Sequence, residues 1–197
     1  MIVSDLHIGK TGHFRKSGIA VPQNVFKEDL QRLVAQLQYF KPVDLIVVGD
    51  FFHSSENKEL DLFRKWRQDF SALNINLVKG NHDILKDNWY SSAGITVFKN
   101  DLSVKQFCFT HDNFGMATRQ ATIDKKEIKY TISGHIHPGV RVNGAGKQSL
   151  CLPCFYFGKD YAVLPAFSRF TGTALMDCKE GDRVFALVNR AIVEVGC

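Results

Sequence analysis

Five short motifs in the chain carry side chains of the kinds that bind divalent metal ions. They are Asp5-x-His7, Gly49-Asp50, Gly80-Asn81-His82-Asp83, His111 and Gly134-His135-x-His137. Carboxylates, imidazoles and one amide together suit borderline cations such as Mn²⁺, Fe or Zn²⁺ better than Ca²⁺, which prefers oxygen ligands throughout. Two such cations form a clamp for in-line attack of hydroxide on phosphorus. The motifs therefore predict a binuclear metal site and, with it, hydrolysis of phosphoesters.

The order and placement of the motifs carry more weight than any one of them. A lone Asp-x-His or His-x-His is more often a surface pair, and Gly-Asp is common in turns. In this chain each motif follows a predicted strand, which is where open α/β sheets build their sites. Residues i and i+2 of a strand point to the same side, so Asp5 and His7 can reach one metal together. His135 and His137 can do likewise, and the glycines that precede three of the ligands allow sharp turns.

The elements that must position these residues alternate between strand and helix in the first part of the chain. Apolar runs predict strands over 2–4, 44–48 and 76–78. Helical periodicity predicts one helix from Asn24 that Pro42 ends, and another from about Asn57 to Phe70. Further along, strand patterns dominate, over 95–98, 107–110, 130–133, 140–142, 161–164, 173–176, 184–188 and 192–195. Residues 113–129 are polar and basic, and we expect a loop or a short helix there.

These elements predict the fold class and the number of domains. The fold expected is an α/β layered domain, with two packed mixed β-sheets flanked by helices. The 197 residues, 45% of them hydrophobic, can bury one core, so we expect a single domain spanning residues 1–197. No apolar run reaches the length that spans a bilayer, and no signal peptide is visible at the start. We therefore expect a cytoplasmic location and no membrane partner.

Five scattered cysteines argue against a disulfide framework and favour reduced thiols. Cys151 and Cys154 form a C-x-x-C pair, but neither a second ligand pair nor a thioredoxin-like context accompanies it. We interpret both as packing residues in a strand.

A basic stretch that contains Lys10, His13, Arg15 and Lys16 lies just after the first metal motif. The net charge of +5 permits a polyanionic partner without requiring one. Lys10, His13 and Arg15 can bind a substrate phosphate, the usual source of affinity for a nucleic acid backbone. A solvated basic loop explains the same residues equally well.

The ordered motifs resemble the calcineurin-like metallophosphoesterase superfamily over nearly the whole chain. By matching positions, the resemblance implies one metal ion on Asp5, His7 and His137, a second on Asn81, His111 and His135, and Asp50 as the bridge between them. It also implies that His82 is the acid that protonates the leaving oxygen. An imidazole beside a ligand titrates in the range useful for that task, which supports the same role independently.

Two more residues near the ligands are catalytic candidates. Asp83 can orient the His82 ring or cap the following turn. His53, three residues after Asp50, stands where related protein phosphatases usually have an acid, and in this it resembles the nuclease branch of the superfamily. His53 can donate to a phosphate oxygen or orient His82, and the alternative is a residue that merely starts the next helix.

Longer strings resemble one family in that branch, the bacterial ligase-associated DNA damage response endonucleases. They cover residues 4–10, 13–19, 152–155 and 164–167. The resemblance implies Mn²⁺, a DNA substrate, and an ATP-dependent DNA ligase and a helicase as partners. It also implies a hairpin before the first strand. Only four residues precede Asp5 here, and this difference from the family pattern is what a truncated or misassigned start would produce.

Three functions are compatible with these residues. We favour a DNA phosphodiesterase or endonuclease that acts through a binuclear metal centre, because of His53 and the basic stretch. A phosphomonoesterase, or a phosphodiesterase for small molecules or cyclic nucleotides, would use the same centre. A non-enzymatic DNA-repair partner protein would have no need of a leaving-group acid at His82.

Overall fold

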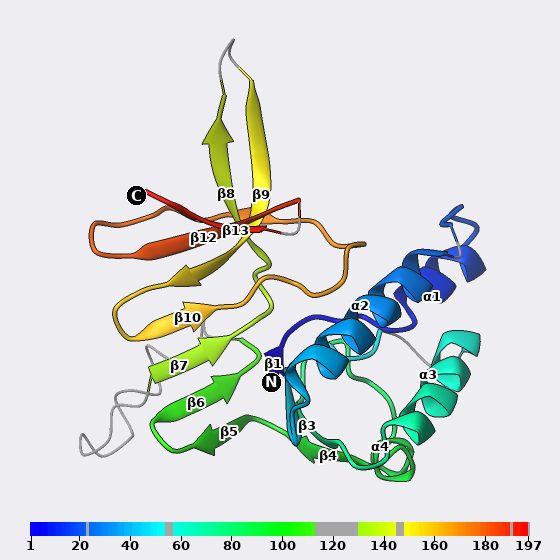
Figure 1. The fold of residues 1–197 in the computed structure, drawn as a ribbon. Helices are drawn as coiled ribbons and strands as arrows, with labels where there is room; N and C mark the ends of the chain where they lie inside the picture. The colour runs from blue at the N-terminus through cyan, green and yellow to red at the C-terminus, as the bar shows by residue number, and fades with distance from the viewer. Residues whose placement is uncertain (23, 54–56, 113–129, 145–147, 190, 197) are drawn as a thin grey trace.

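The computed structural model describes residues 1–22, 24–53, 57–112, 130–144, 148–189 and 191–196 (Figure 1). Strands and helices alternate in the first half: β1 (Ile2–Val3), α1 (Lys10–Lys16), α2 (Asn24–Phe40), β2 (Asp44–Val48), α3 (Lys58–Asp69), β3 (Asn74–Val78), α4 (Asp87–Ser92) and β4 (Ile95–Phe98). Strands make up the described second half: β5 (Asp101–Val104), β6 (Phe107–Thr110), β7 (Tyr130–Ser133), β8 (Pro138–Asn143), β9 (Ser149–Phe157), β10 (Tyr161–Val163), β11 (Ala174–Leu175), β12 (Arg183–Val188) and β13 (Ala191–Val195).

The strands form two sheets of different character. The smaller sheet has the order β1-β2-β3-β4, and all its neighbours are parallel because helical segments return the chain between strands. The larger sheet has the order β11-β8-β9-β10-β7-β6-β5, with β12 on β9 and β13 on β12. It is mixed, because β7 lies parallel to both β6 and β10 while β9 runs antiparallel to its neighbours.

The smaller sheet lies between the helices and the larger sheet (Figure 1). Along β2, Leu45 and Val47 join the cluster that also contains Phe63 of α3, whereas Val48 joins Phe109 of β6 and Leu164 in a second cluster. Successive residues of a strand point to opposite faces, so β2 is apolar on both sides. This burial on both faces explains the nearly continuous apolar run in the sequence.

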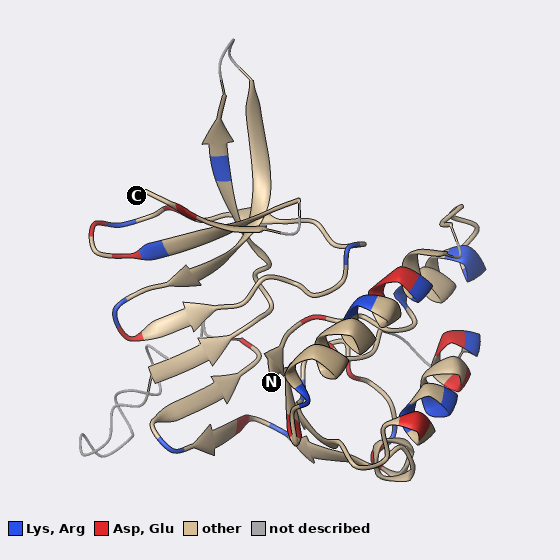
Figure 2. Cartoon of the chain, in the orientation of Figure 1, with Lys and Arg blue, Asp and Glu red and all other residues tan. Residues whose placement is uncertain are grey.

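Local sequence explains where the described helices begin and how they pack. Asn57 caps α3, because its side-chain oxygen accepts a hydrogen bond of 2.9 Å from the Glu59 amide. The helix α2 buries Phe26, Leu33 and Leu37 on one face against the first cluster. Charged residues of both signs are mixed along α2 and α3, and in the larger sheet they lie mostly at turns (Figure 2).

The predicted layered fold, with two packed sheets and flanking helices, is confirmed, although only the larger sheet is mixed. In the described part of the chain the helices lie on one side of the smaller sheet (Figure 1). The basic stretch expected as a loop is the helix α1, and α4 and β5 were not predicted. The prediction for 113–129 lies outside the described residues.

Two further expectations can be compared with the described residues. Cys151 and Cys154 carry free thiols, as predicted, whereas Cys178 is disulfide-bonded, so the expectation of reduced thiols is wrong there. Cys151 and Cys154 lie in β9, with Cys154 fully buried. Among the described helices, none combines the length and the apolar character needed to cross a bilayer.

Candidate metal centre

The metal motifs meet where the two sheets present the carboxyl ends of five strands. In the smaller sheet, β1 is followed by Asp5 and His7, β2 by Asp50, and β3 by Asn81. In the larger sheet, β6 is followed by His111, and β7 by His135 and His137. The chain segments are joined there, because the Gly134 amide donates to the His111 carbonyl and the His135 amide donates to Asp5 Oδ2, at 3.2 and 3.1 Å.

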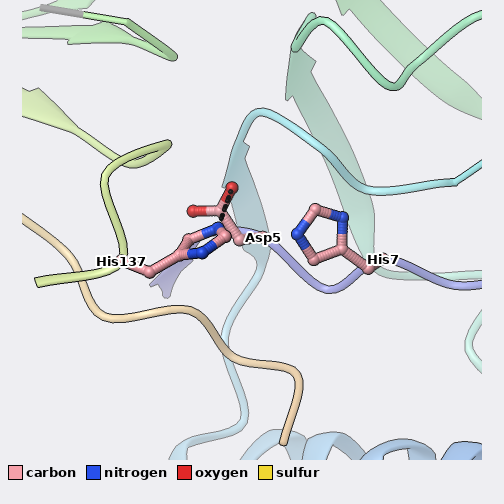
Figure 3. A group of neighbouring side chains, drawn as sticks. All are labelled: Asp5, His7 and His137. Atoms are coloured by element: carbon pink, nitrogen blue, oxygen red, sulfur yellow. Dashed lines mark ion pairs between the residues drawn. The ribbon is translucent and has the colours of Figure 1, made fainter. Parts of the chain in front are cut away.

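The first group of candidate ligands is Asp5, His7 and His137, whose ligand atoms all lie within 4.8 Å of one another. The two imidazoles lie on either side of the Asp5 carboxylate (Figure 3). Oδ1 of Asp5 is 3.3 Å from Nε2 of His137. Oδ2 of the same carboxylate accepts hydrogen bonds from the Ser4 hydroxyl and the His135 amide. One oxygen of Asp5 is thus held by the protein, which leaves the other directed at the imidazoles.

The second group is Asp50, His111 and His135, and Asn81 lies against it. Nε2 of His111 is 3.0 Å from Asn81 Oδ1, 3.1 Å from His135 Nδ1 and 3.4 Å from Asp50 Oδ2. Nδ1 of His111 faces the Val48 carbonyl at 3.3 Å, which favours the tautomer with the proton on Nδ1. A lone pair on Nε2 then points at several other acceptors.

These donor sets fit divalent cations. Ligand atoms about 2.1 Å from a cation lie roughly 3.0–3.4 Å apart in octahedral or tetrahedral geometry, which matches the distances of both groups. In the first group, Asp5 Oδ1, both ring nitrogens of His7 and Nε2 of His137 are buried without a hydrogen-bond partner among the described residues. Buried polar atoms normally have hydrogen-bond partners. These four atoms have lone pairs that a metal cation can accept, so their burial without such partners is consistent with a metal site.

Backbone strain is concentrated at the candidate ligands. Five of them have φ between 49° and 68°, a left-handed conformation that non-glycine residues rarely adopt: Asp5, His7, Asp50, His135 and His137. Such conformations cluster at functional sites because the surrounding structure holds them in place. They also explain a difference from the sequence prediction. His135 and His137 belong to different groups, since the alternation of an extended strand does not apply to residues in this conformation.

The glycines of the motifs are needed mainly because neighbouring groups lie too close for a side chain, and less because the chain turns there. A Cβ on Gly134 would lie 1.8 Å from Ser4 Oγ and 2.6 Å from Asp5 Oδ2. A Cβ on Gly80 would lie 2.2 Å from Asp50 Oδ1. Of the three glycines that precede ligands, only Gly49 has a positive φ, of 79°. The smaller and larger sheets therefore approach each other at the ligands more closely than any side chain would allow.

The surroundings of the site keep His7 neutral and Asp50 ionised, which are the protonation states that bind metal ions. Burial, together with Lys10, lowers the pKa of His7 to about 3, so its imidazole is neutral at neutral pH. Burial opposes ionisation of Asp50, but hydrogen bonding to His111 and the His82 amide outweighs it and lowers the Asp50 pKa to about 2. Burial also opposes charge on His111, and Asp50 outweighs it there and raises the His111 pKa. The additional proton that this raised pKa favours would lie on Nε2, the nitrogen 3.4 Å from Asp50 Oδ2, and a divalent cation would take its place there.

His82 and His53 lie together beside the ligands. Their ring centroids are 4.3 Å apart, and each centroid is 5.6 Å from that of His7. The His82 amide donates to Asp50 Oδ1 at 2.9 Å, which fixes the backbone of His82 against a candidate ligand. Burial and the neighbouring His82 lower the pKa of His53 to about 4, so His53 is neutral at neutral pH.

Asp83 is buried and acts on the backbone. Its Oδ1 accepts from the Phe52 amide at 2.9 Å, and its Oδ2 accepts from the amides of Gly80 and Phe51 at 2.9 and 3.4 Å. Burial raises the Asp83 pKa to about 7 despite these hydrogen bonds. These contacts hold the turns after β2 and β3, a role that differs from both predicted ones, orienting the His82 ring and capping the following turn.

The three predicted phosphate-binding residues of α1 have different surroundings. Lys10 is half-buried with Nζ 3.4 Å from Thr171 Oγ1, and burial lowers its pKa while Asp50 and Asp5 oppose the shift. His13 is exposed, with its ring 5.6 Å from that of His53. Arg15 instead forms an ion pair of 2.7 Å with the buried Glu59 of α3. Lys10 and His13 are therefore at the site, whereas Arg15 joins two helices.

Two supporting residues were not predicted. Ser4 donates to Asp5 Oδ2 and to the Val48 carbonyl, and so orients the carboxylate. Ser168 donates its amide to the Asp5 carbonyl at 3.1 Å and its hydroxyl to Asp29 of α2 at 3.0 Å. Ser4 adjoins a motif, which is a weak signal in the sequence. Nothing in the spacing of Ser168, far along the chain, indicates its contact with Asp5.

The fold and the two ligand groups define a metal-dependent hydrolase of phosphoester bonds with a layered α/β architecture. Residues 1–116 match the family described as calcineurin-like phosphoesterases, and the chain belongs to that family. Enzymes of this family typically depend on two metal ions.

The chain is also similar to solved structures. A nuclease from Pseudomonas putida, MPE, is similar with a TM-score of 0.76 and 25% identity, covering 98% of this chain and 86% of that chain. A protein of unknown function from Aquifex aeolicus, AQ665, has a TM-score of 0.47 and 22% identity, covering 74% of this chain and 81% of that one. The phosphoesterase Yfce from E. coli has a TM-score of 0.45 and 11% identity, covering 99% and 97%. No curated protein matches the chain.

Proposed function

We propose that the protein is a phosphodiesterase that cleaves nucleic acid, with DNA as the expected substrate and Mn²⁺ as the expected metal. The observation that supports this most directly is the pair of histidines, His53 and His82, beside both ligand groups, with ring centroids 4.3 Å apart. The similarity to a nuclease over 98% of the chain points the same way.

In the proposed site, one cation would be held by Asp5, His7 and His137, the other would be held by Asn81, His111 and His135, and Asp50 would serve both. When bound, two divalent cations supply a nucleophile from water at neutral pH and polarise the phosphate oxygens. Ser4 and the His135 amide keep one oxygen of Asp5 occupied, so that the second oxygen faces the metal. The protein thereby presents ligands whose orientation is set before any cation binds.

His82 is the proposed acid, and His53 is proposed to position it. The departing oxygen of a DNA diester is a poor leaving group and gains most from a proton delivered as the bond breaks. His53 remains neutral beside it, so His53 adds no second positive charge that would oppose protonation of His82. Lys10 is proposed to attract the phosphate, because its ammonium group is close enough to Asp5 and Asp50 to interact with both.

The test of the acid compares leaving groups. His82→Ala should still bind two Mn²⁺ ions. Relative to the unmodified protein, it should lose far less activity on bis(4-nitrophenyl) phosphate, whose leaving group needs little protonation, than on DNA. Gln38→Ala is the control, because Gln38 is exposed on α2 and lies outside both ligand groups. It should leave both activities unchanged. Loss of bound metal in His82→Ala would reassign His82 to the ligands.

The test of the substrate class uses the unmodified protein. Mn²⁺-dependent rates on bis(4-nitrophenyl) phosphate, 4-nitrophenyl phosphate, and single-stranded and plasmid DNA are measured under one set of conditions. We expect diester cleavage to exceed monoester cleavage and DNA to be cut. A preference for the monoester would overturn the nuclease proposal and leave the phosphoesterase family assignment intact.

A further inference from the structure

Aromatic rings lead outward from the proposed acid. His53 lies beside His82, and Phe14 of α1 lies beyond His53, with centroids 6.4 Å apart and planes inclined by 20°. Phe170 follows, with its centroid 5.6 Å from that of Phe14 and the two planes 78° apart. The four rings together, His82, His53, Phe14 and Phe170, are called the ring row below.

The two phenylalanines of the ring row do not serve the core. Both are half-buried, and neither belongs to the three apolar clusters of the described residues or packs against them. Buried aromatic side chains normally contribute most by joining a core. Phe14 instead contacts His53 and Phe170, and both phenylalanines are partly accessible to solvent.

The segment that carries Phe170 is fastened next to the metal centre. It follows β10, and the amides of Phe167 and Ser168 donate to the carbonyls of Ser4 and Asp5, at 2.8 and 3.1 Å. One residue after Phe170, Thr171 contacts Lys10. Because these contacts reach both ends of the segment, Phe170 keeps a fixed place relative to the ligands.

Positive groups accompany the rings. Lys10 begins the helix that carries Phe14, and Arg169, with a side chain 62% exposed, precedes Phe170. Among the described residues, the Arg169 side chain forms a long ion pair of 3.6 Å with the exposed Glu28 and interacts electrostatically with Asp29, and most of its guanidinium is available to solvent. Aromatic faces combined with cations beside a phosphate-hydrolysing site are the features that bind single-stranded nucleic acid.

We propose that Phe14 and Phe170 form a stacking platform for one unpaired nucleobase next to the phosphodiester that is cleaved. This inference rests on the proposed nuclease function and specifies how the substrate strand is held. A base stacked on the free face of one ring meets the other ring edge-on, since the two planes are nearly perpendicular. Every base has an aromatic face, so the platform holds a strand without selecting its sequence.

The experiment pairs a ring with a base. Single-stranded oligonucleotides of one sequence, each with an abasic site at a different position around the cleaved bond, are tested with the unmodified protein and with Phe170→Leu. In the unmodified protein, one abasic position should raise KM by roughly 5- to 140-fold, with a much smaller change in kcat. Phe170→Leu should show that increase already with the intact oligonucleotide, and the abasic site should add nothing.

Two variants control for folding and for ring chemistry. Phe157→Leu removes a partly exposed phenylalanine of β9 outside the ring row, and it should leave the abasic pattern unchanged. Phe170→Trp keeps an aromatic face and should retain the sensitivity to the abasic site. Thermal unfolding and the number of bound Mn²⁺ ions are measured for each variant, so that a misfolded protein is recognised.

The outcomes separate the two proposals. If the unmodified protein and Phe170→Leu respond equally to every abasic site, the platform is refuted while the nuclease function stands. If the unmodified protein cleaves no oligonucleotide but hydrolyses other phosphoesters, the proposed substrate class fails and the platform fails with it. Sensitivity to one abasic position that disappears in Phe170→Leu and persists in Phe170→Trp supports the platform.

Discussion

Replacing Arg15 with alanine should weaken the fold and leave substrate affinity nearly unchanged. Glu59, the partner of Arg15, has a side chain only 6% exposed, and the ion pair is 2.7 Å long. Thr11 also donates to the same carboxylate oxygen, so Arg15→Ala leaves Glu59 with a single side-chain donor. A hydrogen bond to a charged group contributes about 1.5–3 kcal/mol. Arg15 is 31% exposed, so water can replace part of the contact, and we expect a loss of about 2 kcal/mol.

For a chain of this length, 1 kcal/mol shifts Tm by about 2–4 °C, so Arg15→Ala should lower Tm by roughly 4–8 °C. The assay is thermal unfolding monitored by circular dichroism, with KM for a DNA substrate measured on the same preparations. Arg15→Met combined with Glu59→Gln should recover much of the loss, because replacing both partners leaves no unpaired charge. Lys10→Ala is the matched control, and we expect the reverse pattern of little change in Tm and a higher KM.

Two results would contradict the roles assigned to Arg15 and Lys10. If Arg15→Ala keeps the Tm of the unmodified protein and raises KM for DNA with a shallower salt dependence, Arg15 binds phosphate and its contact with Glu59 is incidental. If Lys10→Ala leaves KM and its salt dependence unchanged, the basic side chains of α1 play no part in binding the substrate.

Three other predictions concern close packing, metal binding and thiol chemistry. A Cβ at Gly134 would overlap Ser4 Oγ at 1.8 Å and would lie 2.6 Å from Asp5 Oδ2. Gly134→Ala should therefore weaken Mn²⁺ binding by roughly 10–100-fold. Unchanged affinity in a calorimetric titration would contradict this. Mn²⁺ at a concentration about 100 times its Kd should add about 2.7 kcal/mol per site and so raise Tm by roughly 5–11 °C for each site that is occupied. Asp5→Ala should reduce this increase. Equal Tm with Mn²⁺ and with a chelator argues against the centre. Cys154 is fully buried, and burial raises its pKa to about 11. A thiol reagent at pH 8 should therefore modify the exposed Cys151 first and Cys154 only as the protein unfolds. Mass spectrometry of the digested protein measures the order of modification.

Most of the layered architecture could be predicted from the sequence because its signals are local. The run 44–48 is apolar on both faces and became β2, and the periodic apolar residues after Asn24 became α2. The elements that were missed have weak local signals. In α1, seven residues include a glycine and five polar or charged side chains, and the helix is held by Glu59, which lies 44 residues away from Arg15 in the sequence.

The types of candidate ligand, their order and their positions after strands could be read from the sequence alone. Carboxylate, amide and imidazole groups have intrinsic preferences for metals, and the carboxyl ends of parallel strands share one edge of a sheet. The division of the ligands into two groups was implied only by the resemblance to the superfamily, and the tertiary structure supplies its physical reason, because left-handed backbone directs His135 and His137 to different groups. Tertiary packing also pairs Arg15 with Glu59 and brings Phe170 to Phe14, because it places side by side residues that spacing along the chain cannot relate.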